Sequence, residues 1–414
     1  MPVVARELDA LQGYTWAFSA FLVTSLFSMV AGGLWSDATG PRGPLIAGVA
    51  AFSAGAIVAG VANGLPVLVV GRAVQGLGGG AVIVGIYVLI ARAYDVDLRP
   101  KAFSLLAASW VLPALVGPFV AGWLAESVSW RAVFLLVPLF VVPPAVLLFP
   151  RLGQFAGGTP HGAIRARLVA AGFATAGLFA LQDGVLRLSL LGLVEALGGL
   201  VVLLVAARRL LPPGALRFAR GLPTSVMMRG LLAAAYFSAE VFVPLALVDI
   251  RGLSVTAAGL VLSSAALMWV TGSFTQSRLP GDQDRSSAVR TGAAVVTLCL
   301  VTLPLAVLTS LPPWVAAVSW AVGAFGMGLS VPSVSVQVMR LSPDAEQGVN
   351  GAAIQIVDSV MVVVGISLLS LGHAAAVASG GATASTYTAL WLGSAVFAVV
   401  AVVLAGRMRP SLPA

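Results

Sequence analysis

The sequence predicts an all-α protein whose helices cross a membrane many times. Only 9% of its 414 residues are charged, whereas a soluble domain usually carries about 25% charged residues. The mean hydropathy is +1.02, and the apolar residues come in runs of about 20, the length that a helix needs to cross a bilayer. The short alternating segments of a membrane β-barrel are absent from the sequence. These observations disfavour a soluble enzyme, a disordered protein and a coiled coil.

Thirteen apolar stretches are long enough to be predicted as membrane-spanning helices. Their approximate limits are 14–36, 43–62, 67–93, 100–125, 131–150, 164–182, 188–207, 225–248, 255–277, 290–310, 314–339, 347–371 and 385–406. Glycine and proline are frequent within them. Membrane helices tolerate both residues, because neighbouring helices and local rearrangements satisfy the freed backbone groups.

The basic residues indicate how the chain is oriented. Eighteen of the 23 lie in alternate loops: Arg42; Arg92, Arg99, Lys101; Arg151, Arg165, Arg167; Arg208, Arg209, Arg217, Arg220, Arg229; Arg278, Arg285, Arg290; Arg340; Arg407 and Arg409. The opposite loops hold only Arg131, Arg187 and Arg251. Because basic loops stay in the cytoplasm, we expect the first set, and the C-terminus, to be cytoplasmic in a plasma (inner) membrane protein. The net charge of +8 is therefore an orientation signal, and the expected partner is the lipid bilayer, not nucleic acid.

Two stretches on the basic side divide the chain into three parts. Residues 151–163 are rich in glycine, and residues 208–224 contain Pro212, Pro213 and Pro223, so both read as linkers. We expect an N-terminal helix bundle at 1–150, linkers with a two-helix insert at 151–224, and a C-terminal six-helix bundle at 225–414.

The turn after the first span combines small and charged residues at a helix reversal. Gly33 permits a close helix approach, Asp37 is placed to cap the next helix start, and Gly40 allows the tight reversal before Arg42.

Two later spans also carry residues that are unusual within a membrane. Arg72 is costly inside a bilayer and needs a partner or water. Gln75, Gly76 and the glycines that follow them let another helix approach to backbone distance. The fourth span contains Gly117, Pro118 and Gly122.

Together these segments resemble the motifs of the Major Facilitator Superfamily, and within it the drug:proton antiporters with fourteen spans. The turn resembles the loop motif between helices 2 and 3, the Arg72 segment the helix 4 motif, and the Gly117-Pro118 segment the antiporter motif of helix 5. The segment from Phe242 to Leu253 resembles the start of the second half-domain. The resemblance covers essentially the whole chain. It implies two six-helix bundles around a central cavity, with a two-helix insert between them, that operate by alternating access.

The sequence departs from the family pattern within these motifs. Ala38 and Pro41 stand where the family usually has basic residues, so a cytoplasmic charge lock would rest on Asp37 and Arg42. Pro113 and Ala121 replace glycines in the helix 5 motif. In the related turn of the second half, from Gly272 to Arg278, Gln276 stands where an acid is expected.

The sequence also departs from the family at its start. The segment Pro2–Leu8 resembles the one that follows the family's first helix. We therefore interpret the thirteen spans as fourteen minus helix 1, with an external N-terminus. A natural thirteen-span protein is the alternative.

Four ionisable residues lie in the predicted spans: Arg72, Glu195, Glu240 and Asp358. A buried carboxyl group can hold a proton near neutral pH and release it on exposure to water, which makes Glu240 a candidate for proton coupling or cation recognition, with a structural hydrogen bond as the alternative. Asp358 and Gln355 share one helix face, where they could line the cavity of the second half. Arg72 is expected to pair with or tune a proton-carrying acid. Glu195 lies in the insert, which the resemblance places at the periphery, so a structural or lipid-facing role is favoured.

The remaining polar residues suggest no cofactor. Glu126 and Arg131 are expected to pair at a surface, and His161 and His373 to lie in or near loops. Neither a zinc-protease motif nor a phosphate-binding loop is present, so no metal and no ATP are expected, and the chain is not expected to be an enzyme. The resemblance implies proton-coupled export of hydrophobic or amphipathic compounds by a monomer. A lipid or small-metabolite transporter of the same fold, and a non-transporting sensor or truncated copy, remain open.

Overall fold

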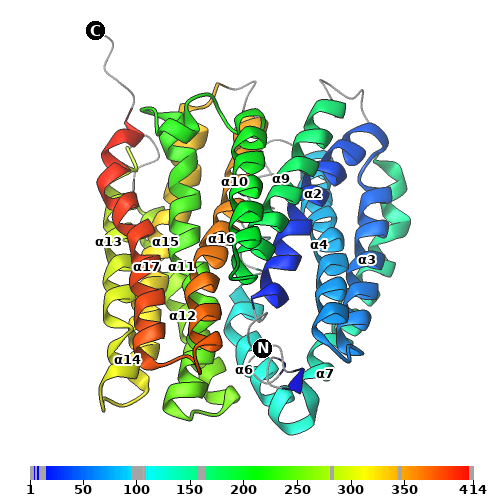
Figure 1. Ribbon diagram of the computed structural model, residues 1–414. Coiled ribbons are helices and arrows are strands. Elements are labelled where there is room, and N and C mark those ends of the chain that lie inside the picture. Colours follow the sequence, from blue (N-terminus) through cyan, green and yellow to red (C-terminus); the bar gives the residue numbers. More distant parts are fainter. Residues whose placement is uncertain are drawn as a thin grey trace.

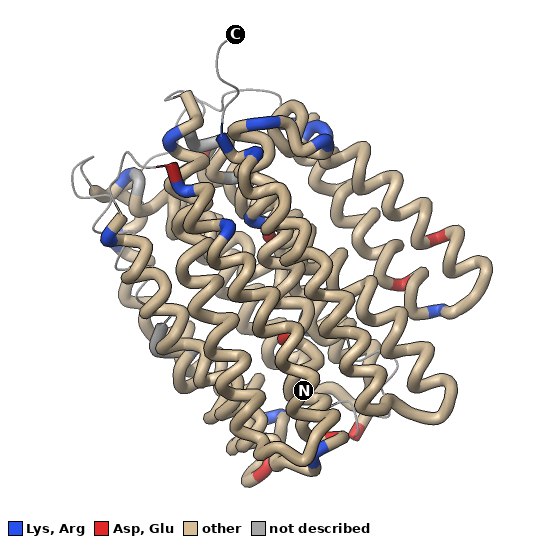
Figure 2. Tube along the Cα trace, turned by 90° about the vertical axis from the view of Figure 1, so that its left-hand side faces the viewer, with Lys and Arg blue, Asp and Glu red and all other residues tan. Residues whose placement is uncertain are grey.

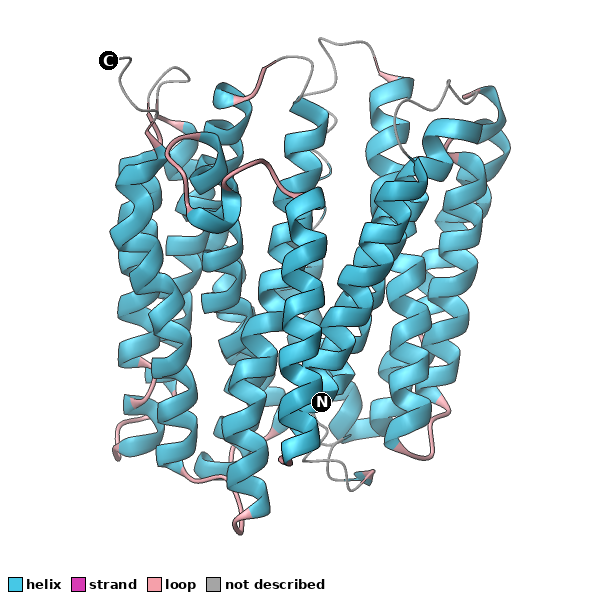
Figure 3. Cartoon of the chain, turned by 45° about the horizontal axis from the view of Figure 1, so that its top comes forward, coloured by secondary structure: helices cyan, strands magenta, loops and turns pink. Residues whose placement is uncertain are grey.

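The computed structural model describes residues 4, 7, 8, 15–94, 106, 109, 111–155, 164–279, 284–343 and 347–409, and all regular structure within them is helical (Figures 1 and 3). We call the end of the bundle at which the C-terminus lies the C-terminal face, and the opposite end the N-terminal face (Figure 1). The basic residues gather at the C-terminal face (Figure 2). The chain is an integral membrane protein by the length and apolar character of its helices.

The helices form two halves and a hairpin between them in sequence. The N-terminal half contains α2 (Trp16–Thr39), α3 (Arg42–Gly60), α4 (Leu65–Ala93), α6 (Val111–Leu124), α7 (Trp130–Leu135) and α8 (Val137–Leu148). The hairpin is α9 (Ile164–Leu186) and α10 (Leu190–Leu210). The C-terminal half contains α11 (Leu222–Arg251), α12 (Val255–Ser277), α13 (Ser286–Thr302), α14 (Leu305–Leu308), α15 (Trp314–Leu341), α16 (Gln347–Ala378) and α17 (Ala384–Leu404).

The described residues contain twelve helical segments that are long and apolar enough to cross a membrane, against the thirteen expected. The difference lies in the 40-residue segment Leu115–Gln154, which is helical almost throughout and counts as one span. This segment corresponds to two predicted spans, 100–125 and 131–150. A π-helical turn at Ala125–Ser129 separates its parts: α6 packs against α12 of the C-terminal half, whereas α7 and α8 pack against α3. Most of residues 100–110 lie outside the described part.

Glycines set the closest helix contacts in both halves. Helix α4 packs against α2 and α3, and α15 packs against α12 and α13 in the same arrangement. A β-carbon at Gly76 of α4 would overlap the backbone of Phe21 in α2. One at Gly328 of α15 would overlap the carbonyl oxygen of Trp269 in α12. The two halves therefore repeat one packing scheme, in which a glycine-bearing helix touches its neighbour's backbone.

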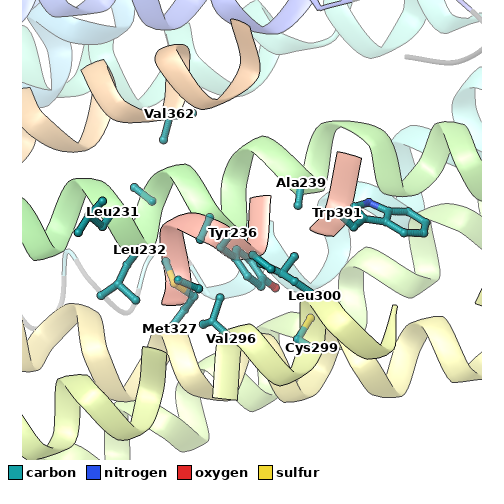
Figure 4. Close-up of a cluster of buried hydrophobic side chains, with 14 of the residues drawn as sticks. Leu231, Leu232, Tyr236, Ala239, Val296, Cys299, Leu300, Met327, Val362 and Trp391 are labelled. Carbon is teal, nitrogen blue, oxygen red and sulfur yellow. The ribbon is translucent and has the colours of Figure 1, made fainter. Parts of the chain in front are cut away.

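Helix α11 forms the centre of the C-terminal half. Its Leu232, Tyr236 and Ala239 lie in one apolar cluster with Val296 and Cys299 of α13 (Figure 4). The cluster extends to Met327 of α15 and Trp391 of α17 (Figure 4). Cys299 is fully buried there, as expected for a small core residue.

The hairpin is not simply peripheral, contrary to the expectation from the family resemblance. Helix α9 packs against α2 of the N-terminal half and against α16 of the C-terminal half. Helix α10 lies on the outside and exposes Leu190, Leu191, Leu193, Val194 and Leu197. The outer face of α10 is therefore lipid-facing.

Substituting Gly328 tests the glycine contacts. Gly328→Leu should destabilise the protein by about 1–3 kcal/mol, because the new side chain meets the α12 backbone and neither helix can yield cheaply. Gly198→Leu is the matched control, since nothing lies within 4 Å of a β-carbon at Gly198. Thermal unfolding of the purified variants measures both effects. Equal stability of the two variants would contradict the packing scheme.

Candidate functional site

One face of α11 is left uncovered by its neighbours. Between residues 224 and 248 nearly every side chain is buried, and the partly exposed residues are Arg229, Phe237, Glu240 and Pro244. Their spacing places them on one helix face. Helices α12 and α16 both pack on α11, and they also contact α6 and α2 of the N-terminal half. The uncovered face, which we call the α11 stripe, therefore looks toward the N-terminal half.

Glu240 is the acid at the middle of this stripe. It is half-buried, and its carboxylate forms no hydrogen bond or ion pair with any described residue. Aromatic rings surround the preceding turn: Tyr236 stacks on Trp320 at 4.2 Å between ring centroids, and Phe237 lies 6.0 Å from Trp269. The site thus combines an uncompensated carboxylate with the partly exposed rings of Phe237 and Trp269, which can bind apolar or cationic groups.

Asp358 is placed differently, because it has a charged partner. Its Oδ1 lies 2.5 Å from Nε of Arg229, and the two side chains are 22% and 15% exposed. Sequence analysis assigned Arg229 to a basic loop, but the residue lies two turns inside α11, so that assignment was wrong. Gln355 is partly exposed one turn earlier on α16, and no hydrogen bond joins it to Asp358 or Arg229. Along α11, Arg229 is about 16 Å from Glu240.

Arg72 is held by neutral groups. Its Nε donates to the carbonyl of Ala17 at 2.8 Å, and its Nη1 donates to Oε1 of Gln75 at 2.8 Å. The guanidinium also lies 4.8 Å above the ring of Phe21. Within the described part of the chain, no carboxylate forms an ion pair with it. The expected pairing of Arg72 with an acid is therefore not seen there, and the Arg72–Gln75–Gly76 segment instead joins α4 to α2.

The loop motif between α2 and α3 forms the predicted reversal. Gly40 ends α2 with φ +92°, a conformation that favours glycine, and α3 begins at Arg42. A β-carbon at Gly33 would lie 3.3 Å from Val84 of α4, so the motif also sets a helix contact. Asp37 and Arg42 do not form an ion pair with each other. Asp37 instead uses its carbonyl oxygen, which lies 3.5 Å from the guanidinium of Arg92.

The related turn of the C-terminal half does have an acid, eight residues after Gln276. Asp284 lies 2.8 Å from Arg409 and 3.6 Å from Arg340, and it accepts hydrogen bonds from Ser286 at the start of α13. Partial burial opposes ionisation of Asp284, but the hydrogen bonds from Ser286 and Arg409 outweigh it and lower the pKa of this carboxyl. Sequence reasoning sought the acid at Gln276 and missed it at Asp284.

The helix 5 motif lies at the contact between the halves. A β-carbon at Gly122 would lie 2.8 Å from the carbonyl oxygen of Val255, and one at Gly259 of α12 would overlap the carbonyl of Pro118. Gly117 faces open space, with nothing within 4 Å of its β-carbon position. Two of the three predicted motif residues therefore bring α6 against α12 near the N-terminal face.

Glu126 extends this contact. Its carboxylate accepts hydrogen bonds from the Val255 backbone amide and the Thr256 hydroxyl at the start of α12, where a negative charge is favourable. The expected pairing with Arg131 is wrong, because Arg131 pairs with Glu7 at 3.3 Å. The N-terminal half thus caps a helix of the C-terminal half.

Glu195 and His373 are both held by neighbouring side chains away from the α11 stripe. Glu195 lies 3.3 Å from Arg187 in the hairpin, which fits the structural role favoured for it. His373 is buried in α16 between the rings of Phe242 and Tyr387, so its expected position in or near a loop was wrong. His161 lies outside the described residues. Among those described, no cluster of histidine, cysteine and acidic residues could hold a metal ion.

Two halves that repeat one helix-packing scheme agree with the result of comparison to known families. The model of the Major Facilitator Superfamily matches residues 1–366. The chain belongs to the Major Facilitator Superfamily. Its members are transporters, and this chain is accordingly a transporter-family protein and not an enzyme.

Similar sequences within the superfamily include two from Bacillus subtilis (strain 168). The multidrug transporter protein MdtP is 26% identical over 393 residues, which is 89% of this chain and 70% of that protein. The methylenomycin A resistance protein is 26% identical over 372 residues, which is 87% of this chain and 79% of that protein. MFS transporter L2 of Phoma sp. is 33% identical over 172 residues, and the match covers only 28% of that protein.

Solved structures share the fold at low sequence identity. A POT family transporter in complex with 5-aminolevulinic acid has a TM-score of 0.69 at 16% identity, over 96% of this chain and 86% of the other. The human organic anion transporter MFSD10 has a TM-score of 0.63 at 14% identity, over 95% of this chain and 83% of the other. These similarities support the superfamily fold.

The Arg229–Asp358 pair can be tested by breaking it from one side. Asp358→Asn should destabilise the protein by on the order of 3 kcal/mol, because it leaves the Arg229 charge uncompensated inside the membrane. The double variant Arg229→Gln/Asp358→Asn removes both charges and should recover much of the loss. Thermal unfolding in detergent measures the three proteins. A double variant less stable than Asp358→Asn would show that the pair is not a unit.

The Asp284 cluster gives a pH-dependent prediction. Since the pKa of Asp284 is lowered in the folded protein, its stabilising effect is complete above the ordinary carboxyl range and is lost as the pH falls below about 4. Asp284→Asn should therefore lower the Tm at pH 7, and the difference from wild type should shrink in acid. Asp37→Asn is the control, because no ion pair holds Asp37 in the described part. A Tm difference for Asp284→Asn that is independent of pH would contradict this explanation.

Proposed function

We propose that the protein is a secondary active transporter that exports hydrophobic or amphipathic compounds in exchange for protons. The observation that carries the proposal is the uncompensated carboxylate of Glu240 on the α11 stripe. The names of the two Bacillus subtilis relatives, a multidrug transporter protein and a methylenomycin A resistance protein, favour export over uptake of a metabolite.

Glu240 would bind a proton and a substrate in turn. An ionised carboxylate within a membrane is costly unless a proton or a cationic group compensates it. Its neighbour Phe237 and the nearby Trp269 offer ring faces to the apolar part of a substrate. Competition between a proton and a substrate for this one group is sufficient to couple their movements in opposite directions.

The other predicted residues would support this exchange in different ways. Asp358 with Arg229 would fix α11 to α16 near the C-terminal face, and Gln355 would contribute a polar contact beside them. Arg72, Gln75 and Gly76 would keep α4 against α2 while the halves move. The loop motif of Gly33, Asp37, Gly40 and Arg42 would control the opening and closing of the C-terminal face.

Alternating access would proceed by movement of one half against the other. The α6–α12 contact through Pro118, Gly122 and Glu126 would close the N-terminal face. The C-terminal face, at which the basic residues gather, would be cytoplasmic. Substrate would then enter from the cytoplasm or the inner leaflet and leave when the α6–α12 contact opens. The protein would work as a monomer in the cell membrane.

Substitution of Glu240 tests the proposal. In proteoliposomes with an imposed pH gradient, the wild-type protein should move ethidium against its gradient, and Glu240→Gln should not, because a neutral amide cannot take up a proton. Glu195→Gln, also a glutamate in a spanning helix but paired with Arg187, is the matched control and should keep proton-driven transport. Fluorescence of DNA-bound ethidium follows the flux.

The other possible results would contradict either the role of Glu240 or the proposed function. Proton-driven transport that survives in Glu240→Gln removes Glu240 from the mechanism. Flux of labelled lipids or of small polar metabolites, without flux of ethidium, would indicate the alternative substrates. No flux of any compound by a well-folded wild-type protein would indicate a non-transporting membrane protein.

A further inference from the structure

One amide side chain links the hairpin to both halves. Nε2 of Gln182 in α9 donates a hydrogen bond to the Thr15 hydroxyl at 2.9 Å, and Oε1 accepts one from the Ser367 hydroxyl at 2.6 Å. Thr15 directly precedes α2 in the N-terminal half, and Ser367 belongs to α16 in the C-terminal half. Gln182 and Ser367 are fully buried, and Thr15 is 2% exposed. One side chain of the hairpin therefore bridges the two halves, in addition to their direct contacts.

Apolar packing surrounds this link. Leu26 of α2, Leu178 of α9 and Val363 of α16 lie in one buried cluster. The opposite face of α9 packs closely on α10. β-carbons at Gly177 and Gly184 of α9 would lie within 2.7 Å of the α10 backbone. The hairpin is therefore a stiff element that presents Gln182 to both halves.

The link lies toward the same face as the direct contact between the halves. Gln182 is about one turn from the end of α9 at the N-terminal face, and Thr15 stands at the start of α2. On the other flank, Gly122 and Glu126 bring α6 against the start of α12. Both flanks of the molecule thus have a connection between the halves on the side of the N-terminal face.

We propose that Gln182 is a positioning residue of the transport cycle, which holds the N-terminal face closed by tying Thr15 to Ser367 through the hairpin. This role rests on the alternating access proposed above. An amide suits it, because one group donates and accepts at the same time. When the face opens, water can replace either hydrogen bond, so the link contributes a small bias that a substrate or a proton can overcome.

Labelling of a cysteine on the opposite flank tests this role. Ser263 is buried on α12 one turn beyond Gly259, so it shares the helix face that packs on α6. In a Cys299→Ala/Ser263→Cys background, which carries no other cysteine, a water-soluble maleimide is applied to the full chain in nanodiscs. Gln182→Leu should speed labelling about three- to tenfold, the effect of losing one or two buried hydrogen bonds from the closed state.

Two further variants separate this role from general loosening of the fold. Glu195→Gln removes a hairpin contact that does not bridge the halves and should leave the labelling rate unchanged. Ser367→Ala removes one arm of the link and should speed labelling, while the Gln182→Leu/Ser367→Ala double variant should label no faster than Gln182→Leu alone.

Unchanged labelling of monodisperse Gln182→Leu protein would overturn the proposal, and so would equal acceleration by Glu195→Gln. If Gln182→Leu does not fold, Ser367→Ala decides, because its unchanged labelling would also overturn the proposal. The measurement needs neither ethidium nor a pH gradient. A failure of proton coupling at Glu240 would therefore leave its result intact.

Discussion

The cost of placing charge in a bilayer is the constraint on which this structure depends. The charged side chains in the spanning helices are mostly stabilised by a partner that offsets this cost. Arg229 and Asp358 compensate each other, and Arg72 is surrounded by a carbonyl, an amide and an aromatic ring. Glu240 has no such partner among the described residues. An ionised carboxylate without a partner inside the membrane is stabilised when a proton or a cationic substrate binds to it, so Glu240 is the expected binding position for either one.

The position of Glu240 follows from the packing of α11. Its neighbours cover every side of this helix except the stripe, and glycine contacts such as Gly230 of α11 against Val357 of α16 make that covering close. The same neighbours, α12 and α16, are the helices that reach the N-terminal half. The unpaired acid therefore faces the region that must change when one half moves against the other.

The sequence alone was sufficient to predict the class of fold, the approximate limits of most spans and the close helix approach at Gly33 and Gly76. These features depend on local composition: apolar runs of membrane length, and glycines spaced along one helix. The resemblance of the Arg72 and Gly117-Pro118 segments to known motifs supplied the superfamily, which the family model confirmed.

Pairings between distant residues could not be predicted in this way. Arg229 and Asp358 are 129 residues apart, and Arg229 was misassigned because a basic residue near the end of a span usually belongs to a cytoplasmic loop. Glu126 caps a helix 129 residues later, although Arg131 offered a nearer partner. Gln182 gave no signal at all, since a single glutamine in an apolar run acquires meaning only when its neighbours in space are known.

The central claim is that a proton and a substrate exclude each other at Glu240. Its most direct test is the release of protons when a lipophilic cation, tetraphenylphosphonium, is added to the purified protein in weakly buffered detergent solution with a pH-indicator dye. The account predicts proton release from the wild-type protein and none from Glu240→Gln. Binding of the cation to the wild-type protein without proton release, or release of equal size from Glu240→Gln, would contradict it.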